Sequence, residues 1–206
     1  MTPDDLERAL ARTAPRSDPD AAAAAARRAA AQAGETGAAD VAYAIEPSPV
    51  GDLLVAVTAR GLVNLSYEVG RLDRLLDRLA GRVSPRVVEA PARLDPVRRE
   101  LDEYFAGTRR SFETPLDWSL TRGFTRRVLR ATAKIPYGGE STYREIATRA
   151  GSERAVRAAG NALGANPIPI VVPCHRVVRT GGDLGGYGGG VERKRFLLEL
   201  EGAQAS

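Results

Sequence analysis

The sequence of 206 residues is poor in the side chains that form cross-links and bind soft metals. It contains one cysteine, Cys174, and one histidine, His175. A single thiol excludes an internal disulfide, and this pair alone excludes a zinc site built from the usual cysteine and histidine ligands. We therefore expect no metal, and the chemistry of Cys174 must proceed without a second thiol from the same chain.

Long apolar runs are also absent. No hydrophobic stretch is long enough to span a bilayer, so we expect no membrane association. Residues 1–10 are acidic and have neither the apolar core of a secretory signal nor the Arg-rich composition of a transit peptide, which predicts a cytoplasmic protein. With 43% hydrophobic and 27% charged residues, the composition is typical of a folded globular protein.

Lysine is scarce, and the basic residues, nearly all arginine, are unevenly distributed along the chain. Residues 119–206 contain 14 basic and 7 acidic side chains and carry a net charge of +7, whereas residues 1–118 carry −3. A positive field confined to the second half predicts that this half binds a polyanion.

The pattern of the chain changes at about residues 40 and 118. Residues 1–39 are rich in alanine without a recurring apolar face, and we interpret them as a frayed helix or a disordered extension. Residues 40–118 predict a small α+β domain, although the total length also suits a single domain. Its expected elements are a three-stranded meander (41–45, 53–57 and 62–67), a helix over 72–79, a strand near residue 87 and an amphipathic helix through 94–104.

Residues 119–206 are predicted to be mainly helical. Thr142 can cap a helix that runs to about residue 150, because Glu145 completes a capping box. A glycine-containing turn then leads to a second helix, predicted over residues 153–163, that carries Arg154 and Arg157. This pattern matches a helix-turn-helix, and an ordinary helical hairpin with solvated arginines shares it. Four alanines would allow the second helix to approach DNA closely: Ala155, Ala158, Ala159 and Ala162.

The most informative stretch is Asn166-Pro-Ile-Pro-Ile-Val-Val-Pro-Cys-His-Arg-Val-Val-Arg179. A cysteine is a nucleophile only as a thiolate, so its ordinary pKa of about 8.5 has to be lowered by a base or a positive field. Consecutive side chains of an extended backbone point to opposite faces. His175 could therefore activate Cys174 only through a turn or a bridging water, and a third group would have to orient it. A structural cysteine beside a histidine is the alternative.

This stretch resembles the active-site signature of the O6-alkylguanine-DNA alkyltransferases, the methylated-DNA–protein-cysteine methyltransferase family. The resemblance covers residues 124–202 and includes Phe124-Thr-Arg-Arg-Val, Pro136-Tyr-Gly, Thr142-Tyr-Arg-Glu-Ile-Ala, Arg157-Ala-Ala-Gly-Asn-Ala and Gly185-Gly-Tyr-Gly-Gly-Gly. It implies an α+β protein with a small ribonuclease H-like N-terminal domain. The C-terminal domain, residues 119–206, would be helical with a winged-helix-like helix-turn-helix, and no cofactor is implied.

The resemblance also implies a role for each matching residue. Cys174 would accept the alkyl group, activated through water by His175, which Glu201 would orient. Tyr143 would bind the flipped guanine and supply a proton as the base leaves, and Asn166 would brace the turn of Cys174. The backbone of Val177, Tyr187 and Gly188 would read the guanine edge. DNA contacts would come from Thr142, Arg154, Ala155, Arg157 and Ala158, with Arg157 entering the base stack in place of the extruded nucleotide.

The implied function is DNA repair by irreversible, stoichiometric transfer of an alkyl group from O6-alkylguanine, and from O4-alkylthymine, in duplex DNA to Cys174. The helix-turn-helix would flip the base from the minor groove, where readout of sequence is degenerate. We expect a monomer whose partner is double-stranded DNA with alkylated bases. Two alternatives stay open: a non-catalytic DNA-binding module, and a Cys-His hydrolase that turns over repeatedly. Gly186 and Gly188 are smaller than the residues often found there in the family, which leaves the preferred alkyl size open.

Overall fold

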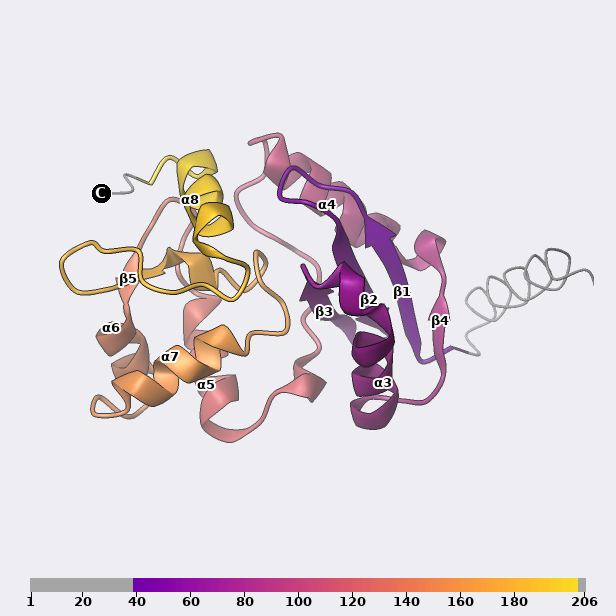
Figure 1. Ribbon diagram of the computed structural model, residues 1–206, viewed down its shortest axis with the longest axis horizontal. Helices are drawn as coiled ribbons and strands as arrows, with labels where there is room; N and C mark the ends of the chain where they lie inside the picture. Colours follow the sequence, from indigo (N-terminus) through magenta and orange to yellow (C-terminus); the bar gives the residue numbers. More distant parts are fainter. Residues whose placement is uncertain (1–38, 204–206) are drawn as a thin grey trace, which may run out of the picture.

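The computed structural model describes residues 39–203, and the alanine-rich segment lies outside them except for Ala39 (Figure 1). The first half is built on a four-stranded sheet in the order β3-β2-β1-β4. Strands β1 (Val41–Glu46), β2 (Leu53–Thr58) and β3 (Gly61–Ser66) are antiparallel. Strand β4 (Val87–Glu89) pairs in parallel with β1. The predicted meander and the strand near residue 87 are confirmed.

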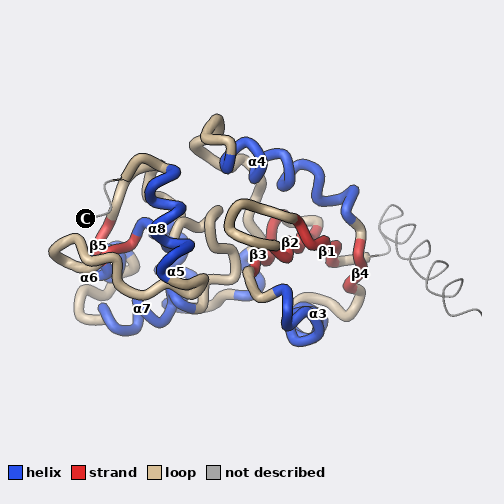
Figure 2. Tube along the Cα trace, turned by 45° about the horizontal axis from the view of Figure 1, so that its top comes forward, coloured by secondary structure: helices blue, strands red, loops and turns tan. Residues whose placement is uncertain are grey.

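Two helices cover opposite faces of this sheet, as Figure 2 shows: α3 (Leu72–Arg82) on one side and α4 (Asp95–Phe105) on the other. Successive side chains of a strand point to opposite faces, so β2 contributes to both interfaces. Leu54 packs with the buried leucines of α3, whereas Leu53 and Val55 belong to the core beneath α4. The apolar spacing of α4 that predicted an amphipathic helix therefore marks the face that it buries.

The second half is mainly helical, as predicted, and contains a two-stranded parallel pair of β5 and β6. None of the helices in residues 39–203 has the length and apolar character needed to cross a bilayer. The elements are α5 (Gly123–Thr132), β5 (Ser141–Thr142), α6 (Tyr143–Arg149), α7 (Val156–Gly164), β6 (Val177–Val178) and α8 (Val191–Leu200). Short 3-10 turns lie at Val69–Arg71 (η1), Pro91–Leu94 (η2), Trp118–Leu120 (η3) and Cys174–Arg176 (η4).

Helices α6 and α7 form the predicted helix-turn-helix. The capping box at the start of α6 is present, because Thr142 accepts from the backbone of Glu145 and Glu145 accepts in return from the backbone of Thr142. The expected start of the second helix at residue 153 is wrong. A turn closed by the hydrogen bond from Ala155 N to Ser152 O occupies these residues, and α7 begins at Val156. Arg154 therefore lies in the turn.

The outer edge of β3 faces the second half of the chain. Leu65 N donates to Pro167 O at 2.8 Å, and Leu62 exchanges backbone hydrogen bonds with residues 115 and 117. The hydroxyls of Tyr67 and Tyr187 lie 2.8 Å apart, and Arg193 Nε donates to Val50 O at 2.7 Å. The backbone contacts of Leu62 and Leu65 cover an otherwise unpaired strand edge. The contact of Leu65 with Pro167 also fixes the first half against the turn that precedes Cys174, and the two side-chain contacts join it to residues 187 and 193.

We expect Gly61→Ala to destabilise the protein strongly, by about 2 kcal/mol or more. Gly61 has a φ of +119°, and a Cβ there would lie 2.0 Å from Pro115 O. Urea denaturation would measure the change in the free energy of unfolding. Gly70→Ala is the matched control, because a Cβ at Gly70 would meet nothing within 4 Å. Equal stability of the two variants would contradict this account of the strand edge.

Candidate active site

Cys174 begins η4 at the end of a tightly folded turn. Asn166 braces this turn, because its Nδ2 donates to Val172 O at 2.8 Å and to Cys174 Sγ at 3.1 Å, and its Oδ1 accepts from Ile168 N at 3.0 Å. Ile170, at the tip, has a φ of +72°, an unfavourable conformation for a β-branched residue. The surrounding hydrogen bonds maintain it, so the turn places the thiol in one fixed position.

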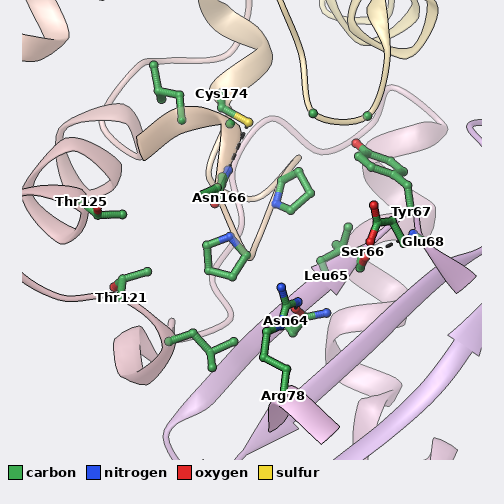
Figure 3. Close-up of a pocket in the computed structure, with 18 of the residues that line it drawn as sticks. Asn64, Leu65, Ser66, Tyr67, Glu68, Arg78, Thr121, Thr125, Asn166 and Cys174 are labelled. Atoms are coloured by element: carbon green, nitrogen blue, oxygen red, sulfur yellow. Dashed lines mark hydrogen bonds between the residues drawn. The ribbon is translucent and has the colours of Figure 1, made fainter. Parts of the chain in front are cut away.

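Cys174 is only slightly accessible, at 8% exposure, and lines a cavity of about 750 Å³ between the two halves of the chain (Figure 3). Burial raises the pKa of Cys174, while the hydrogen bond from Asn166, the positive charge of Lys194 and the hydroxyl of Tyr187 lower it. Burial is the largest of these effects. The resting group is therefore a thiol, and forming the thiolate requires a base.

His175 is fully buried and lies against Glu201, with 2.9 Å between Nε2 and Oε1. Burial lowers the pKa of His175 more than the carboxylate raises it, so the ring is neutral near pH 7. A neutral ring that donates from Nε2 to a carboxylate leaves Nδ1 as an acceptor. Within residues 39–203, Nδ1 has no hydrogen-bond partner. The η4 turn thus gives His175 the free acceptor nitrogen that a general base needs.

Glu201 follows α8 and receives hydrogen bonds from several directions. Its Oε1 accepts from Tyr104 Oη at 2.6 Å and from Arg176 Nη2 at 2.8 Å, and its Oε2 accepts from Arg176 Nε at 2.7 Å. The backbone N of Gly138 is a further donor, at 3.3 Å. Burial alone would raise the pKa of Glu201, but the hydrogen bonds from His175 and Arg176 outweigh it and lower the pKa to about 2. The carboxylate is ionised at neutral pH.

Tyr143 and the glycine-rich loop form another wall of the site. The hydroxyl of Tyr143, at the start of α6, donates to Gly186 O at 3.3 Å, and burial raises the pKa of this tyrosine. A side chain on Gly185, whose φ is +65°, would come within 3.1 Å of that hydroxyl. Glycine at this position therefore lets the loop approach Tyr143. Tyr187 extends from the same loop to Tyr67 of the first half.

Val177, expected to read a base through its backbone, is largely engaged within the protein. Its N–H donates to Cys174 O, and its carbonyl accepts from Lys194 Nζ at 2.6 Å. Val177 is also fully buried and pairs with Ser141 in the β5–β6 ladder. Gly188, on the loop, is exposed and lines the cavity.

The helix-turn-helix presents some, but not all, of the expected DNA-contacting residues to solvent. Arg154, Arg157 and Ala158 are exposed, whereas Thr142 and Ala155 are half-buried. Within residues 39–203, Arg157 makes no ion pair. Ala159 and Ala162, two of the four alanines expected to let this helix approach DNA closely, instead pack into the core.

Two residues of the site were missed from the sequence. Lys194 is fully buried on α8, where its Nζ donates to the carbonyls of Val177 and Leu184, and burial lowers its pKa to about 8. Its spacing from Leu197 and Leu198 places it on the buried face of α8, and this was the available signal. Tyr104 was recognised only as an apolar position of α4. Among residues 39–203, no cluster of histidine, cysteine, aspartate and glutamate could hold a metal ion.

Comparisons with known proteins agree on one family. The family model described as "6-O-methylguanine DNA methyltransferase, ribonuclease-like domain" matches residues 41–118, and "6-O-methylguanine DNA methyltransferase, DNA binding domain" matches residues 123–203. A methylated-DNA–protein-cysteine methyltransferase of Mycobacterium tuberculosis is 40% identical over 79% of this chain and 93% of its own length. The inducible protein of that name from Bacillus subtilis is 38% identical over 71% of this chain and 82% of its own length.

Solved structures give the same result. The crystal structure of the Mycobacterium tuberculosis O6-methylguanine methyltransferase superimposes with a TM-score of 0.65, at 40% identity, over 78% of this chain and 92% of that one. A Mycobacterium tuberculosis structure in complex with DNA gives a TM-score of 0.66 at the same identity and coverage. The structure from Pyrococcus kodakaraensis gives 0.54 at 27% identity, over 79% of this chain and 99% of that one.

We expect Glu201→Gln to lower the free energy of unfolding at pH 7 by about 3 kcal/mol, because it leaves Arg176 buried without a counter-charge. The folded-state pKa of about 2 lies below the value of about 4.3 for an unfolded glutamate. The stabilisation by ionised Glu201 is therefore complete above about pH 5 and is lost as the pH falls towards 2.

Thermal unfolding of the wild type and the variant between pH 7 and pH 2 would measure this effect. Their difference in Tm should shrink with acidification. Glu192→Gln, at an exposed glutamate of the same helix, should match the wild type throughout. A difference between wild type and Glu201→Gln that stays constant over this range would contradict the ionised state.

Proposed function

The chain belongs to the 6-O-methylguanine DNA methyltransferase family, and on this basis we propose that it repairs DNA by moving an alkyl group from O6-alkylguanine in duplex DNA onto Cys174. One observation carries the assignment to Cys174. The only cysteine of the chain lies in a cavity, receives a hydrogen bond from Asn166, and is followed by a histidine that a buried carboxylate orients. This is the arrangement that an activated nucleophile needs.

Activation begins with the transfer of the thiol proton. Neutral His175 accepts it at Nδ1 through a water molecule, and Glu201 stabilises the imidazolium that results. The donated hydrogen bond from Asn166 and the charge of Lys194 both favour the thiolate over the thiol. Burial outweighs both effects and keeps the resting group a thiol, which also protects it from other electrophiles.

The chemical step is an in-line displacement at the carbon bonded to O6. The Cys174 sulfur forms a bond to this carbon, the bond between carbon and O6 breaks, and its electron pair stays with the guanine. Tyr143 supplies a proton to the leaving base, and Val177, Tyr187 and Gly188 contact its edge. The product is a thioether, which thiol exchange does not reverse because it contains no disulfide. Each molecule therefore acts once.

DNA binds along the helix-turn-helix in the minor groove. Exposed Arg157 enters the base stack and replaces the extruded nucleotide, while Arg154, Thr142, Ala155 and Ala158 contact the surrounding DNA. The net charge of +7 on residues 119–206 supports a polyanionic partner for this face. O4-alkylthymine is a second substrate, because a flipped thymine would present its alkylated O4 to Cys174 where guanine presents its alkylated O6.

We propose that the protein acts as a monomer. We also propose a cytoplasmic location, since the proposed substrate is duplex DNA. Size-exclusion chromatography with light scattering of the alkylated and unalkylated protein would measure the oligomeric state directly.

We expect duplex DNA with a single O6-methylguanine to add the mass of one methylene to Cys174, at no more than one equivalent per protein. Mass spectrometry of the intact protein and of the Cys174 peptide would measure this. Cys174→Ser should bind the duplex but gain no mass. Continued conversion of excess substrate would indicate a hydrolase, and binding without any mass gain would indicate a DNA-binding module.

We expect Arg157→Ala to slow methyl transfer from duplex DNA by about ten-fold or more, because nothing then offsets the unstacking of the base, which costs a few kcal/mol. Transfer from a single-stranded oligonucleotide should change little, since its base is already unpaired. Rapid-quench kinetics on both substrates would provide the comparison. An equal loss on both would argue against a role for Arg157 in base extrusion.

A further inference from the structure

The cavity at Cys174 extends well beyond the part, beside Tyr187 and Gly188, that a flipped base and its alkyl group would occupy. Its volume of about 750 Å³ lies within the range of sites that bind small molecules, about 300–1,000 Å³. Cys174 and Tyr187 line one part. The other part lies against β3 and α3 in the first half of the chain, where its lining includes Asn64, Glu68, Arg78 and Arg82.

Asn64 is an unusual residue for the interior of β3. It is fully buried, at 0% exposure, in a strand whose other inner positions are apolar. Its Oδ1 accepts from Arg78 Nη2 at 3.0 Å, but within residues 39–203 its Nδ2 has no hydrogen-bond partner. A buried donor without a partner costs about 1–3 kcal/mol. Because Asn64 lines the cavity, a ligand in the cavity can satisfy this donor.

The charged side chains around Asn64 are mainly positive. Arg78, Arg82 and Arg122 line the cavity, and Glu68 is the carboxylate among its lining residues. Figure 3 shows Asn64 and Arg78 together on the side of the cavity away from Cys174. We call Asn64, Arg78 and Arg82 the Asn64 subsite. Its donors and net positive charge suit a carboxylate, which accepts charge-assisted hydrogen bonds from guanidinium and amide groups.

We propose that the Asn64 subsite binds the carboxylate end of long O6-carboxyalkyl groups while the carbon bonded to O6 lies at Cys174. This inference rests on the alkyl transfer proposed above and names a substrate class for it. The reaction is unchanged: sulfur bonds to the first carbon, that carbon leaves O6, and the distal carboxylate takes no part. The methylenes between these two ends would pack against apolar lining residues, namely Leu163, Pro167 and Pro169.

A phosphate of the DNA backbone is a less suitable ligand for this subsite. Asn64 Nδ2 is completely buried, so its partner has to enter the cavity. A flexible alkyl chain that starts at Cys174 can do so, whereas a phosphate is constrained by the duplex. After transfer the chain stays attached to the sulfur, so the cavity accommodates the product as well as the substrate.

The test compares duplexes that carry O6-methylguanine, O6-(n-alkyl)guanine and the O6-(ω-carboxyalkyl)guanine of matched length, over a series of increasing chain lengths. The rate of alkyl transfer to Cys174 is measured by mass spectrometry. At the best length, the wild type should react about ten-fold faster with the carboxylate than with the matched n-alkyl group. Asn64→Leu and Arg78→Met should each abolish this preference and leave methyl transfer unchanged.

Arg74→Met is the matched control, because Arg74 is an exposed arginine one turn earlier on α3 that is not among the lining residues. It should retain the preference. Equal wild-type rates for the carboxylate and the n-alkyl group at every length would overturn the subsite. So would an equal slowing of all lesions, including methyl, by Arg78→Met, which would make Arg78 a DNA contact. Failure of the wild type to take up methyl would instead overturn the proposed function itself.

Discussion

The buried carboxylate of Glu201 connects the elements that surround the nucleophile. It accepts hydrogen bonds from Tyr104 on α4 and from His175 and Arg176 on η4. An isolated carboxylate would be neutral in such an environment, so its charge depends on these donors. The guanidinium of Arg176 balances the negative charge, and His175 can then remain neutral with a free nitrogen. The neutral state of His175 is thus a property of the whole cluster and not of the histidine alone.

The first half of the chain does more than support the site, because it also forms part of the cavity wall. Strand β3 binds the Cys174 turn through Leu65 and Pro167, and Tyr67 contacts Tyr187 by both its hydroxyl and its ring. Arg193 of α8 lies over the Tyr67 ring at 4.9 Å. One wall of the cavity therefore comes from the sheet. Residues of β3 and α3, about a hundred positions before Cys174 in the sequence, therefore line the same cavity as the thiol.

Local patterns predicted most of the fold. The alternation of β1 to β3, the apolar spacing of α4 and the capping box at Thr142 each depend on neighbours within a few residues, and the structure confirms them. The start of α7 was misplaced because Glu153 and Arg154 suit a helix locally, while the turn that excludes them is set by backbone hydrogen bonds.

The site residues that belong to the family's sequence motif could be predicted from the sequence. The family resemblance pointed to Cys174, His175, Asn166 and Glu201, and the structure brings these four residues together. Tyr104 and Asn64 could not be found this way. The role of a tyrosine on an apolar helix face, or of an asparagine in a strand, depends on the residues that the fold places next to it. Lys194 had a signal in its helical spacing, but its contacts with the carbonyls of Val177 and Leu184 are tertiary.

These long-range contacts also bear on how the protein is made. Tyr104 and Glu201 are separated by 97 residues, Tyr67 and Tyr187 by 120, and Val50 and Arg193 by 143. A chain emerging from a ribosome exposes its amino-terminal sheet long before α8 exists, and domains generally fold in that order. The sheet can then form with the edge of β3 covered at Leu62 but still open at Leu65. Pro167 covers the rest of that edge, and α8 then completes the surroundings of the thiol with Lys194. The site is therefore assembled only after most of the chain has left the ribosome.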